Sequence, residues 1–460
     1  MQTTAMPPPY DPFPLEIVRL VPGDQRIACD CRTAIPHDTL RAEITTLDGQ
    51  VVQAVCAAAP YEHIEAAGLA NGIDYRLKLT AERAGQTVGA APERLFRCGF
   101  FPGVVINYIH PDDYTYMPSG RSPASPSLLR LSSGRLLASH DIFWGGCAQN
   151  LSMVFASDDK GITWQYLSRI CPCFWGKLFE HRGSIYMLGM RAEYGALLIF
   201  RSEDGVSWSA PAELLPGGDC DRGGPHKAPM PVVSCQDRLW TAIDYGSWSL
   251  GGHANGLISA GLDADLMDPG QWVCTGFLPY NPDWPGTSRG KSGGCLEGNA
   301  VVAPDGRLYN VLRYQTNGCE PRYGRAMLLE ADPSRPDAPL HFAAVIDFPG
   351  NLSKFKVDYD PVTRRYYALV SRVTTDFLSQ RNLLTLTSSP DLFRWRIERD
   401  ILNYADNGWP EPVDKVGFQY VDWIFDGPDI LALSRTALNG AWNYHNANAL
   451  TVHRISHFRR

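Results

Sequence analysis

The chain has 460 residues, of which 44% are hydrophobic and 20% are charged, a balance typical of a folded globular protein with a sizeable core. Its net charge is −7 and no basic run stands out, which argues against nucleic acid as a partner. No segment reaches the roughly 18 consecutive apolar residues of a membrane helix, and residues 1–10 lack the pattern of a leader. We therefore expect no membrane partner. We expect a cytoplasmic location for the chain as written, or secretion if a leader has been removed.

Residues 13–100 predict a small β-sandwich. Apolar and polar residues alternate in short runs separated by turn signals such as Asp48-Gly49 and Asn71-Gly72, and such alternation is typical of half-buried strands. Residues 68–75 resemble the corner before the sixth strand of a fibronectin type III module. No cluster of catalytic residue types lies in this region, so we expect an accessory domain.

Residues 102–460 follow a different rhythm, a repeat of paired strands. Each unit enters through a polar residue, runs along an apolar strand, turns at a glycine and returns along a second apolar strand. Six such units lie at residues 125–143, 175–190, 226–245, 297–313, 354–372 and 418–435. This pattern predicts an all-β fold with a six-bladed β-propeller; a seventh blade built from weaker segments is the alternative. We expect residues 104–108 to pair with the last blade, because ring closure leaves no exposed sheet edge.

One acidic turn recurs within the repeat. Residues 157–164 combine an aspartate that accepts backbone hydrogen bonds, a glycine for the positive-φ position and a tryptophan that plugs beneath the loop. Looser copies stand at residues 202–208 and 388–395. The pattern resembles the Asp-box, or BNR repeat, of sialidases and related β-propellers. The resemblance implies a sialidase-like propeller whose boxes sit on the outer rim, away from the chemistry.

Candidate site residues gather where the strand pairs begin and end. In a propeller, the entry of each first strand and the exit of each second strand meet at one face, where ligands bind. Charged residues at such core-facing positions are costly unless they meet water or a ligand. The first strands supply Lys177, His226, Lys227, Glu297, Lys354, Gln419 and Tyr420, and the second strands supply His140, Asp141, Arg191, Asp244, Arg313, Arg372 and Arg435. This local surplus of positive charge on an acidic chain predicts an acidic glycan as the partner.

Part of this set resembles the sialidases residue by residue. Glu297 and Arg313 match the blade in which sialidases place the glutamate that activates their tyrosine nucleophile and an arginine that binds the substrate carboxylate. Tyr420 matches the nucleophile itself, and Arg381 or Arg372 stands for a further arginine of the carboxylate site.

The first blade departs from that family. Residues 124–126 read Ala-Ser-Pro where sialidases have Arg-Ile-Pro, and residues 144–149 lack their acid aspartate. His110, His140 and His226 take their place. In this respect the propeller resembles the lyases that cleave uronate-containing glycans, such as rhamnose–glucuronate and ulvan lyases, and the related rhamnosidases, more than the true sialidases.

This second resemblance implies exo-acting cleavage of an acidic, uronate-containing glycan by β-elimination, with a rhamnose linkage as one form of the substrate. Such a reaction needs a cation on the uronate carboxylate, a base with a near-neutral pKa and an acid for the leaving oxygen. We expect His140 as the base with Asp141 orienting its ring, Arg313 on the carboxylate and Tyr420 as the acid.

Two other functions remain open. A sialidase-like exo-glycoside hydrolase would use Tyr420 as nucleophile and Glu297 as its base, an exception to the usual two-carboxylate scheme. A non-catalytic, glycan-binding propeller is the other. Residues 442–448, which include His445, offer rings that stack on a sugar face, or amides that satisfy their own backbone. The sequence indicates no cofactor and leaves a structural or substrate-bridging divalent cation open.

Overall fold

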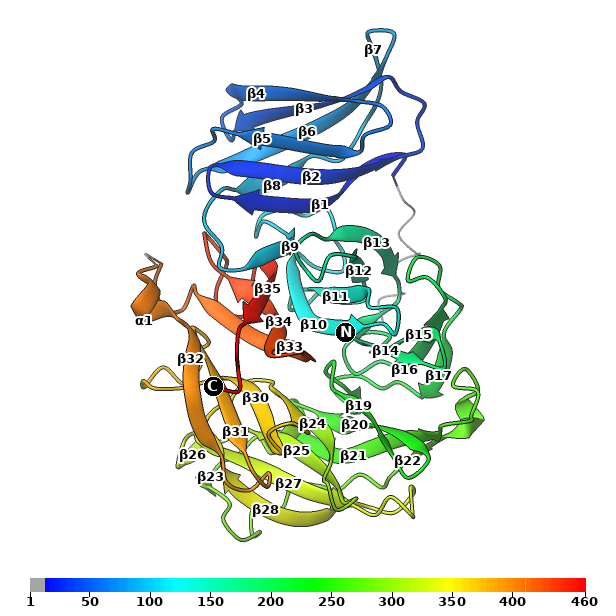
Figure 1. Ribbon diagram of the computed structural model, residues 1–460, viewed down its shortest axis with the longest axis vertical. Coiled ribbons are helices and arrows are strands. Elements are labelled where there is room, and N and C mark those ends of the chain that lie inside the picture. The colour runs from blue at the N-terminus through cyan, green and yellow to red at the C-terminus, as the bar shows by residue number, and fades with distance from the viewer. Residues whose placement is uncertain (1–12, 410) are drawn as a thin grey trace.

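The computed structural model describes residues 13–409 and 411–460, and these residues form β-strands with very little helix. A small two-sheet unit at the N-terminus lies against a ring of six sheets (Figure 1). The helices in the described part of the chain are α1 (Tyr404–Asn407) and the 3-10 helix η1 (Pro269–Gln271). The all-β, six-bladed propeller predicted from the sequence is confirmed.

The N-terminal unit has two sheets, one in the order β1-β2-β5 and one in the order β4-β3-β6-β7, with β8 paired to β6. Their strands are β1 (Leu15–Gly23), β2 (Arg26–Thr33), β3 (Thr39–Thr46), β4 (Val51–Ala58), β5 (His63–Ala67), β6 (Asp74–Arg83), β7 (Gln86–Ala90) and β8 (Arg94–Arg97). Alternate residues of β6, including Tyr75, Leu77 and Leu79, are buried in the core. The fibronectin type III assignment and the accessory role stay predictions.

Each blade of the ring is a sheet of antiparallel strands. Blade one contains β10 (Ser122–Arg130), β11 (Leu136–Phe143), β12 (Ser152–Ser157) and β13 (Gln165–Ile170). Blade two contains β14 (Phe174–His181), β15 (Ser184–Met190), β16 (Leu197–Ser202) and β17 (Ala212–Leu215). Blade three contains β18 (Gly224–His226), β19 (Val232–Cys235), β20 (Arg238–Ser247), β21 (Gly252–Gly261) and β22 (Trp272–Cys274).

The other three blades follow the same plan. Blade four contains β24 (Cys295–Val302), β25 (Leu308–Tyr314), β27 (Arg325–Ala331) and β28 (His341–Asp347). Blade five contains β29 (Lys356–Asp360), β30 (Arg365–Ser371), β31 (Leu383–Ser389) and β32 (Arg396–Asn403). Blade six contains β33 (Gly417–Asp426), β34 (Asp429–Ala437) and β35 (Ala449–Ile455). A separate pair of short strands, β23 (Arg289–Gly290) and β26 (Cys319–Glu320), lies beside blade four.

The ring closes as predicted. β9 (Val104–Tyr108) precedes blade one in sequence but pairs with β35 as the outer strand of blade six, with Tyr108 opposite Ala449 and Val104 opposite Val452 (Figure 1). Closure leaves neither end of the ring with an unpaired blade, so the sheets pack face to face around one channel.

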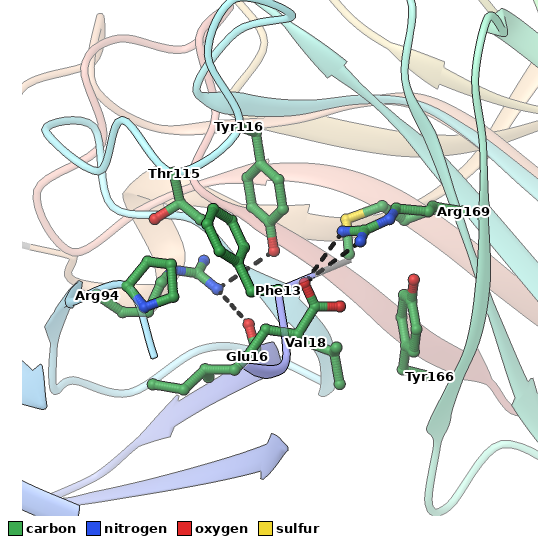
Figure 2. Close-up of a pocket in the computed structure, with 11 residues that line it drawn as sticks. Phe13, Glu16, Val18, Arg94, Thr115, Tyr116, Tyr166 and Arg169 are labelled. Carbon is green, nitrogen blue, oxygen red and sulfur yellow. Dashed lines mark hydrogen bonds and ion pairs between the residues drawn. The ribbon is translucent and has the colours of Figure 1, made fainter. Parts of the chain in front are cut away.

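Buried polar contacts fix the N-terminal unit to the propeller. Arg94 donates to the Ile17 carbonyl at 2.8 Å and to the Tyr116 hydroxyl at 3.2 Å, and Arg169 donates to Glu16 at 3.3 Å (Figure 2). Arg94 also donates to Asp113 at 2.5 Å. The cavity between these side chains measures about 20 Å³, the size of one water molecule. This cavity therefore belongs to the joint between the two units.

The three acidic turns share one hydrogen-bonding pattern at the outer ends of the blades. Asp159 accepts backbone N–H bonds from Ile162 and Thr163 at 3.0 and 2.9 Å. Asp204 and Asp391 accept the corresponding pairs of backbone bonds in the other two turns. In the first turn the buried Trp164 donates from its indole to the Gly161 carbonyl at 3.2 Å, which locks the ring beneath the loop.

Replacing Asp159 with alanine is expected to lower the free energy of unfolding by about 1–2 kcal/mol, because several backbone donors lose their acceptor at a partly exposed turn. Urea unfolding measures this change. The activity of the site described below should stay the same, since the turn lies at the outer edge of its blade. Unchanged stability would show that water replaces the carboxylate without loss.

Candidate active site

The second strands of the blades end at one face of the ring, here called the entry face. Near this face, the first strands of four blades carry the same irregularity. In β10, β14, β24 and β33 the pairing register shifts, as in a β-bulge. The residue at each shift has a left-handed backbone: Ser125 at φ 49°, Trp175 at 52°, Glu297 at 52° and Tyr420 at 56°. Such backbone strain persists where the surrounding structure enforces it, and a bulge re-aims a side chain. The fold thus presents these four side chains at the entry face.

Two of these bulges bring a tyrosine and a glutamate together across the ring. Tyr420 of blade six donates its hydroxyl to Glu297 Oε1 of blade four at 2.7 Å. Arg313, at the end of β25, donates from Nη1 to Glu297 Oε2 at 2.7 Å and to the Tyr420 hydroxyl at 3.0 Å. Glu297 and Arg313 are buried, and Tyr420 is partly exposed.

The ionisation of this pair follows from its surroundings. Burial, followed by the negative charge of Glu297, raises the pKa of Tyr420 to about 12, so the phenol keeps its proton at rest. Burial by itself would raise the pKa of Glu297, but Arg313 reverses this and holds that pKa below its ordinary value. The pair is therefore a neutral phenol bonded to an ionised carboxylate, which is the arrangement of a nucleophile and its base.

Two further arginines complete what we call the site cluster: Glu297, Arg313, Arg381, Tyr420 and Arg435. Arg435, at the end of β34, lies with its guanidinium 5.5 Å from the centre of the Tyr420 ring. Arg381 stands in the loop after β30, where its Nη atoms donate to the carbonyls of Gln380 and Leu352 at 2.8 and 2.6 Å.

The arginines of the site cluster keep free donors although they are buried. Burial lowers the pKa of both Arg381 and Arg435 to about 10, so both remain cations at neutral pH. The Nε atoms of Arg313, Arg381 and Arg435 are buried and have no hydrogen-bond partner among the residues that the structure describes. Buried donors in this state indicate a ligand that accepts from them.

Buried carboxylates hold the bulges in place. Asp244, at the end of β20, accepts the backbone N–H of Glu297 at 2.8 Å and the Asn255 amide at 2.8 Å. Asp141 has the same role between blades one and two, where it accepts the backbone N–H of Trp175 at 2.7 Å. Both carboxylates are therefore engaged in positioning backbone.

Beneath the site cluster the channel is lined by four buried lysines, here called the channel lysines: Lys177, Lys227, Lys354 and Lys356. One buried carboxylate, Asp422, meets Lys177 at 2.5 Å and Lys356 at 3.5 Å. Lys354 donates to the Val421 carbonyl at 3.2 Å. Farther along, a cavity of about 430 Å³ lies among the inner strands of all six blades.

Lys227 bonds to neutral acceptors, and no carboxylate of the described residues is among its hydrogen-bond partners. Its Nζ donates to Thr241 Oγ1 at 2.8 Å and to the Ala242 carbonyl at 3.1 Å. Burial lowers the pKa of Lys227 to about 7; Asp244 opposes this shift, and the charges of Lys177 and Lys354 add to it.

The free energy of unfolding should therefore rise with pH from about 7 towards 10. Between these pH values Lys227 has lost its proton in the folded chain. The same lysine is still protonated in the unfolded chain, where its pKa is ~10.4. Lys227→Met should flatten the rise, whereas Lys78→Met, at an exposed position of β6, should not. Urea unfolding across the window measures both slopes. Equal slopes in the wild type and Lys227→Met would contradict the prediction.

The structure does not bring His140 to Tyr420. The His140 ring is buried inside blade one, stacked on Phe155 at 5.5 Å between ring centres. Its Nδ1 lies 3.0 Å from the Asp141 carbonyl and its Nε2 lies 3.0 Å from the Asn107 amide. Burial lowers the pKa of His140 to about 4. This geometry disagrees with the predicted base, because both nitrogens are already bonded, and Asp141 holds the backbone of Trp175 with its carboxylate instead of orienting the ring.

Three other predicted substrate ligands lie away from the site cluster. His110 bonds Asp74 at 3.2 Å in the joint with the N-terminal unit. Arg191 pairs with Glu213 at 3.4 Å on the surface of blade two, and Arg372 pairs with Asp400 at 2.9 Å. Of the predicted alternatives Arg381 and Arg372, it is therefore Arg381 that joins the cluster.

The remaining predicted residues line the entry face or the channel. His445 lies 3.5 Å from Arg435 Nη2, and burial with the Arg435 charge lowers the pKa of His445 to about 3. His226 packs edge-on against Trp175, with 4.4 Å between ring centres, and Nδ1 lies 3.4 Å from Asp244. Lys177, Lys227 and Lys354 belong to the channel lysines, and their amino groups bond to partners other than the Tyr420 hydroxyl.

Sequence reasoning missed several residues, among them Glu193 and His253 at the entry face and Asp422 in the channel. Asp422 has a readable signal, since it stands two residues after Tyr420 in an apolar strand. His253 is buried 4.4 Å from the His226 ring, and neither of its ring nitrogens has a partner among the described residues. Glu193 stands in a short polar loop that carries no local signal.

Two classes of site find no candidate in the described ranges 13–409 and 411–460. No group of three or more His, Cys, Asp or Glu side chains there is placed to hold a metal ion. No helix in these ranges is long and apolar enough to span a membrane.

The closed ring of six blades, with the site cluster at its entry face, is a six-bladed β-propeller. Comparison with solved structures finds this fold in the GH93 alpha-L-arabinofuranosidase of Fusarium graminearum in complex with arabinobiose; the TM-score is 0.50 and the identity 14%, over 77% of this chain and 98% of that one. The leech intramolecular trans-sialidase complexed with 2,7-anhydro-Neu5Ac is similar with a TM-score of 0.51 and 11% identity, over 96% of this chain and 91% of that one. No protein-family model and no curated protein sequence matches the chain. At these identities the likeness shows the shared fold.

Proposed function

We propose that the protein is an exo-acting glycoside hydrolase that removes a terminal, carboxylate-bearing sugar from a glycan, with Tyr420 as nucleophile and Glu297 as its base. The observation that carries this proposal is the bond from the Tyr420 hydroxyl to Glu297 at 2.7 Å, with Arg313 bonded to both. An ionised acceptor in contact with a phenol takes its proton as the oxygen attacks an anomeric carbon. Both fold neighbours are named for their action on glycans, which agrees with this reading.

The reaction runs in two displacements with retained configuration. In the first, the Tyr420 oxygen forms a bond to the anomeric carbon, the bond to the leaving oxygen breaks, and the phenol proton moves to Glu297. In the second, a water oxygen bonds to the same carbon, the bond to Tyr420 breaks, and the proton returns from Glu297 to the tyrosine oxygen. The attacking water gives up one proton, which balances the proton that the leaving oxygen takes up in the first displacement. Arg313, at 3.0 Å from the hydroxyl, stabilises the negative charge that develops on the tyrosine oxygen.

The charge of the site cluster favours an acidic sugar. Three arginines stand against the one carboxylate of Glu297, and their Nε donors have no partner among the described residues. A substrate carboxylate fits planar guanidinium donors and satisfies them. The ligand of the leech protein, 2,7-anhydro-Neu5Ac, is likewise a sugar with a carboxylate. The burial of Glu297 and the arginines favours a chain end over the middle of a polymer.

We do not extend the proposal to β-elimination. That reaction would need His140 as the base, and both ring nitrogens of His140 are already bonded, one to the Asp141 carbonyl of blade one and one to Asn107 of blade six. Its acid, Tyr420, is bonded to a carboxylate that draws the proton away from a leaving group. The rhamnose linkage and the uronate identity of the substrate have no contact among the described residues that supports them.

A panel of aryl glycosides tests the proposal. The panel contains a sialic acid and two uronic acids as acidic sugars and an arabinofuranoside as the neutral control, and NMR follows the anomer first released. We expect cleavage of an acidic member with retention, and little cleavage of the neutral one. Unsaturated, ultraviolet-absorbing ends from uronate polysaccharides would establish a lyase instead, and binding without cleavage would establish a lectin-like propeller.

A further inference from the structure

The site cluster holds a nucleophile and its base but no group that protonates the leaving oxygen. Glu297 is engaged by Tyr420 and Arg313, and its charge is needed there. Asp141 and Asp244 end second strands at the same face, but each is 1% exposed and holds the backbone of the next blade. A general acid for this site must therefore be a further carboxyl group that solvent and substrate reach.

Glu193 meets this requirement by position. It stands in the loop after β15, the second strand of blade two, and such loops meet at the entry face. The side chain is exposed. The buried Gln149, in the corresponding loop of blade one, donates from Nε2 to Glu193 Oε2 at 3.5 Å, and Gln149 Oε1 has no partner among the described residues. The Gln149 amide and the Glu193 carboxyl group thus lie side by side at the entry face, where both can hydrogen-bond a sugar.

The neighbouring residue ties the loop to the site. Tyr194 is buried with φ 59°, and its ring lies 6.0 Å from the rings of both His226 and His253. His226 contacts Asp244, whose carboxylate holds the Glu297 backbone at 2.8 Å. The Glu193 loop is thus linked to the Glu297 backbone through Tyr194, His226 and Asp244.

The electrostatics of the two glutamates differ in the way that acid and base roles require. Protein surrounding the carboxyl group raises the pKa of Glu193 above its ordinary value, although His226 acts in the opposite direction. The pKa of Glu297 is lowered, as described above, and His226 is among the groups that lower it. Glu193 is therefore favoured in its protonated form and Glu297 in its ionised form. These are the states that a general acid and a base require.

We propose that Glu193 is the general acid and base of the glycoside cleavage at Tyr420. In the first displacement the Glu193 proton goes to the leaving oxygen while the phenol proton goes to Glu297. In the second, Glu193 accepts a proton from the attacking water while Glu297 returns its proton to the tyrosine oxygen. Each displacement forms one bond to the anomeric carbon and breaks one, and the enzyme ends as it began. This inference rests on the function proposed above.

The experiment compares leaving groups in the full-length protein. With an alkyl glycoside of the acidic sugar, whose leaving oxygen needs protonation, Glu193→Ala should lower kcat/KM by roughly 10²–10⁴-fold. With a dinitrophenyl glycoside, which leaves without a proton, the first step should keep a rate near that of the wild type. Azide should restore turnover and give a glycosyl azide, and the alkaline limb of the pH profile should disappear. Glu213→Ala, in the same blade and paired with the surface Arg191, is the matched control and should change neither.

The outcomes separate the two proposals. If the wild type cleaves no acidic glycoside, the proposed function fails and this inference falls with it. If the wild type cleaves and depends on Tyr420, but Glu193→Ala keeps its rate on the alkyl glycoside, Glu193 is not the acid while the function stands. An equal loss on both leaving groups, without rescue by azide, assigns Glu193 to binding and also overturns the inference. Glu193→Gln, which keeps the size of the side chain, should repeat the alanine result.

Discussion

Tyr420→Phe should lower kcat/KM on an acidic aryl glycoside by on the order of 10³-fold or more, because it removes the oxygen that the proposed function assigns as the nucleophile. The change deletes one atom from a partly exposed ring, so the fold should persist. Glu297 and Arg313 lose one bonded partner but keep each other at 2.7 Å. Steady-state kinetics measures the loss, and thermal unfolding checks that the variant is folded.

Two companion variants sharpen this result. Glu297→Gln keeps the size of the side chain but cannot take the phenol proton, and it should lose activity to a similar order. Tyr245→Phe, at a half-exposed tyrosine of β20 outside the site cluster, should keep the wild-type rate. Full activity of Tyr420→Phe with retained configuration would overturn the assignment of the nucleophile.

Asp422→Asn should lower the free energy of unfolding by about 3–5 kcal/mol, the range for breaking a buried ion pair from one side. The Asp422 carboxylate is fully buried and accepts from Lys177 at 2.5 Å, from the Leu128 N–H at 2.8 Å and from the Trp423 N–H at 3.0 Å. Without its charge the channel lysines face one another across the channel. Urea unfolding at neutral pH measures the loss.

The pH dependence of this effect has a defined sign. Burial alone would raise the pKa of Asp422, but Lys177, Lys356 and Lys354 lower it well below its ordinary range. The carboxylate therefore contributes stability that is present above the unfolded pKa, near ~3.9, and is lost as the pH falls through the folded value. The gap between wild type and Asp422→Asn should also narrow at alkaline pH, because burial lowers the pKa of Lys354 to about 8 and this lysine then sheds its charge.

Asp358→Asn is the matched control, since Asp358 lies 3.7 Å from Lys356 but is 45% exposed. Solvent screens that pair, so the change should be small, up to about 1 kcal/mol. Equal losses in the two variants would mean that Asp422 does not hold the channel together.

The fold could be predicted from the sequence because each blade is a local structure. The strand pairs are separated by single turns, and the glycines and aspartates that shape those turns lie within a few residues of the strands. The sequence predicts that residues 104–108 close the ring, and β9 occupies that place. The places of Glu297, Arg313 and Tyr420 in the repeat also predict that these three residues belong to one site.

The error at His140 has a simple geometric cause. Side chains on a strand alternate between two faces, so a shift of one residue changes the face. In each of four blades, one residue of the second strand pairs with the residue of the first strand that stands just before the bulge, or at the equivalent place in blade three. These second-strand residues correspond from blade to blade and are Asp141, Asp244, Arg313 and Arg435. His140 is one residue earlier and lies between blades one and six, where Phe155 of blade one and Asn107 of blade six enclose it. The sequence repeat predicted correctly where the strand ends, but it did not predict on which face of the strand each side chain lies.

The sequence by itself determined the strand pairs, the ring and the residue types at its entry face, because turns and alternation act over a few neighbouring residues. The tertiary structure decided which of those residues meet. Tyr420 reaches Glu297 across 123 positions because two bulges face each other. Arg372 is taken by Asp400, 28 positions away, while Arg381 is left for the site. Glu193 joins the entry face through its contact with Gln149 in the neighbouring blade, and such contacts depend on how neighbouring blades pack, which no local pattern encodes.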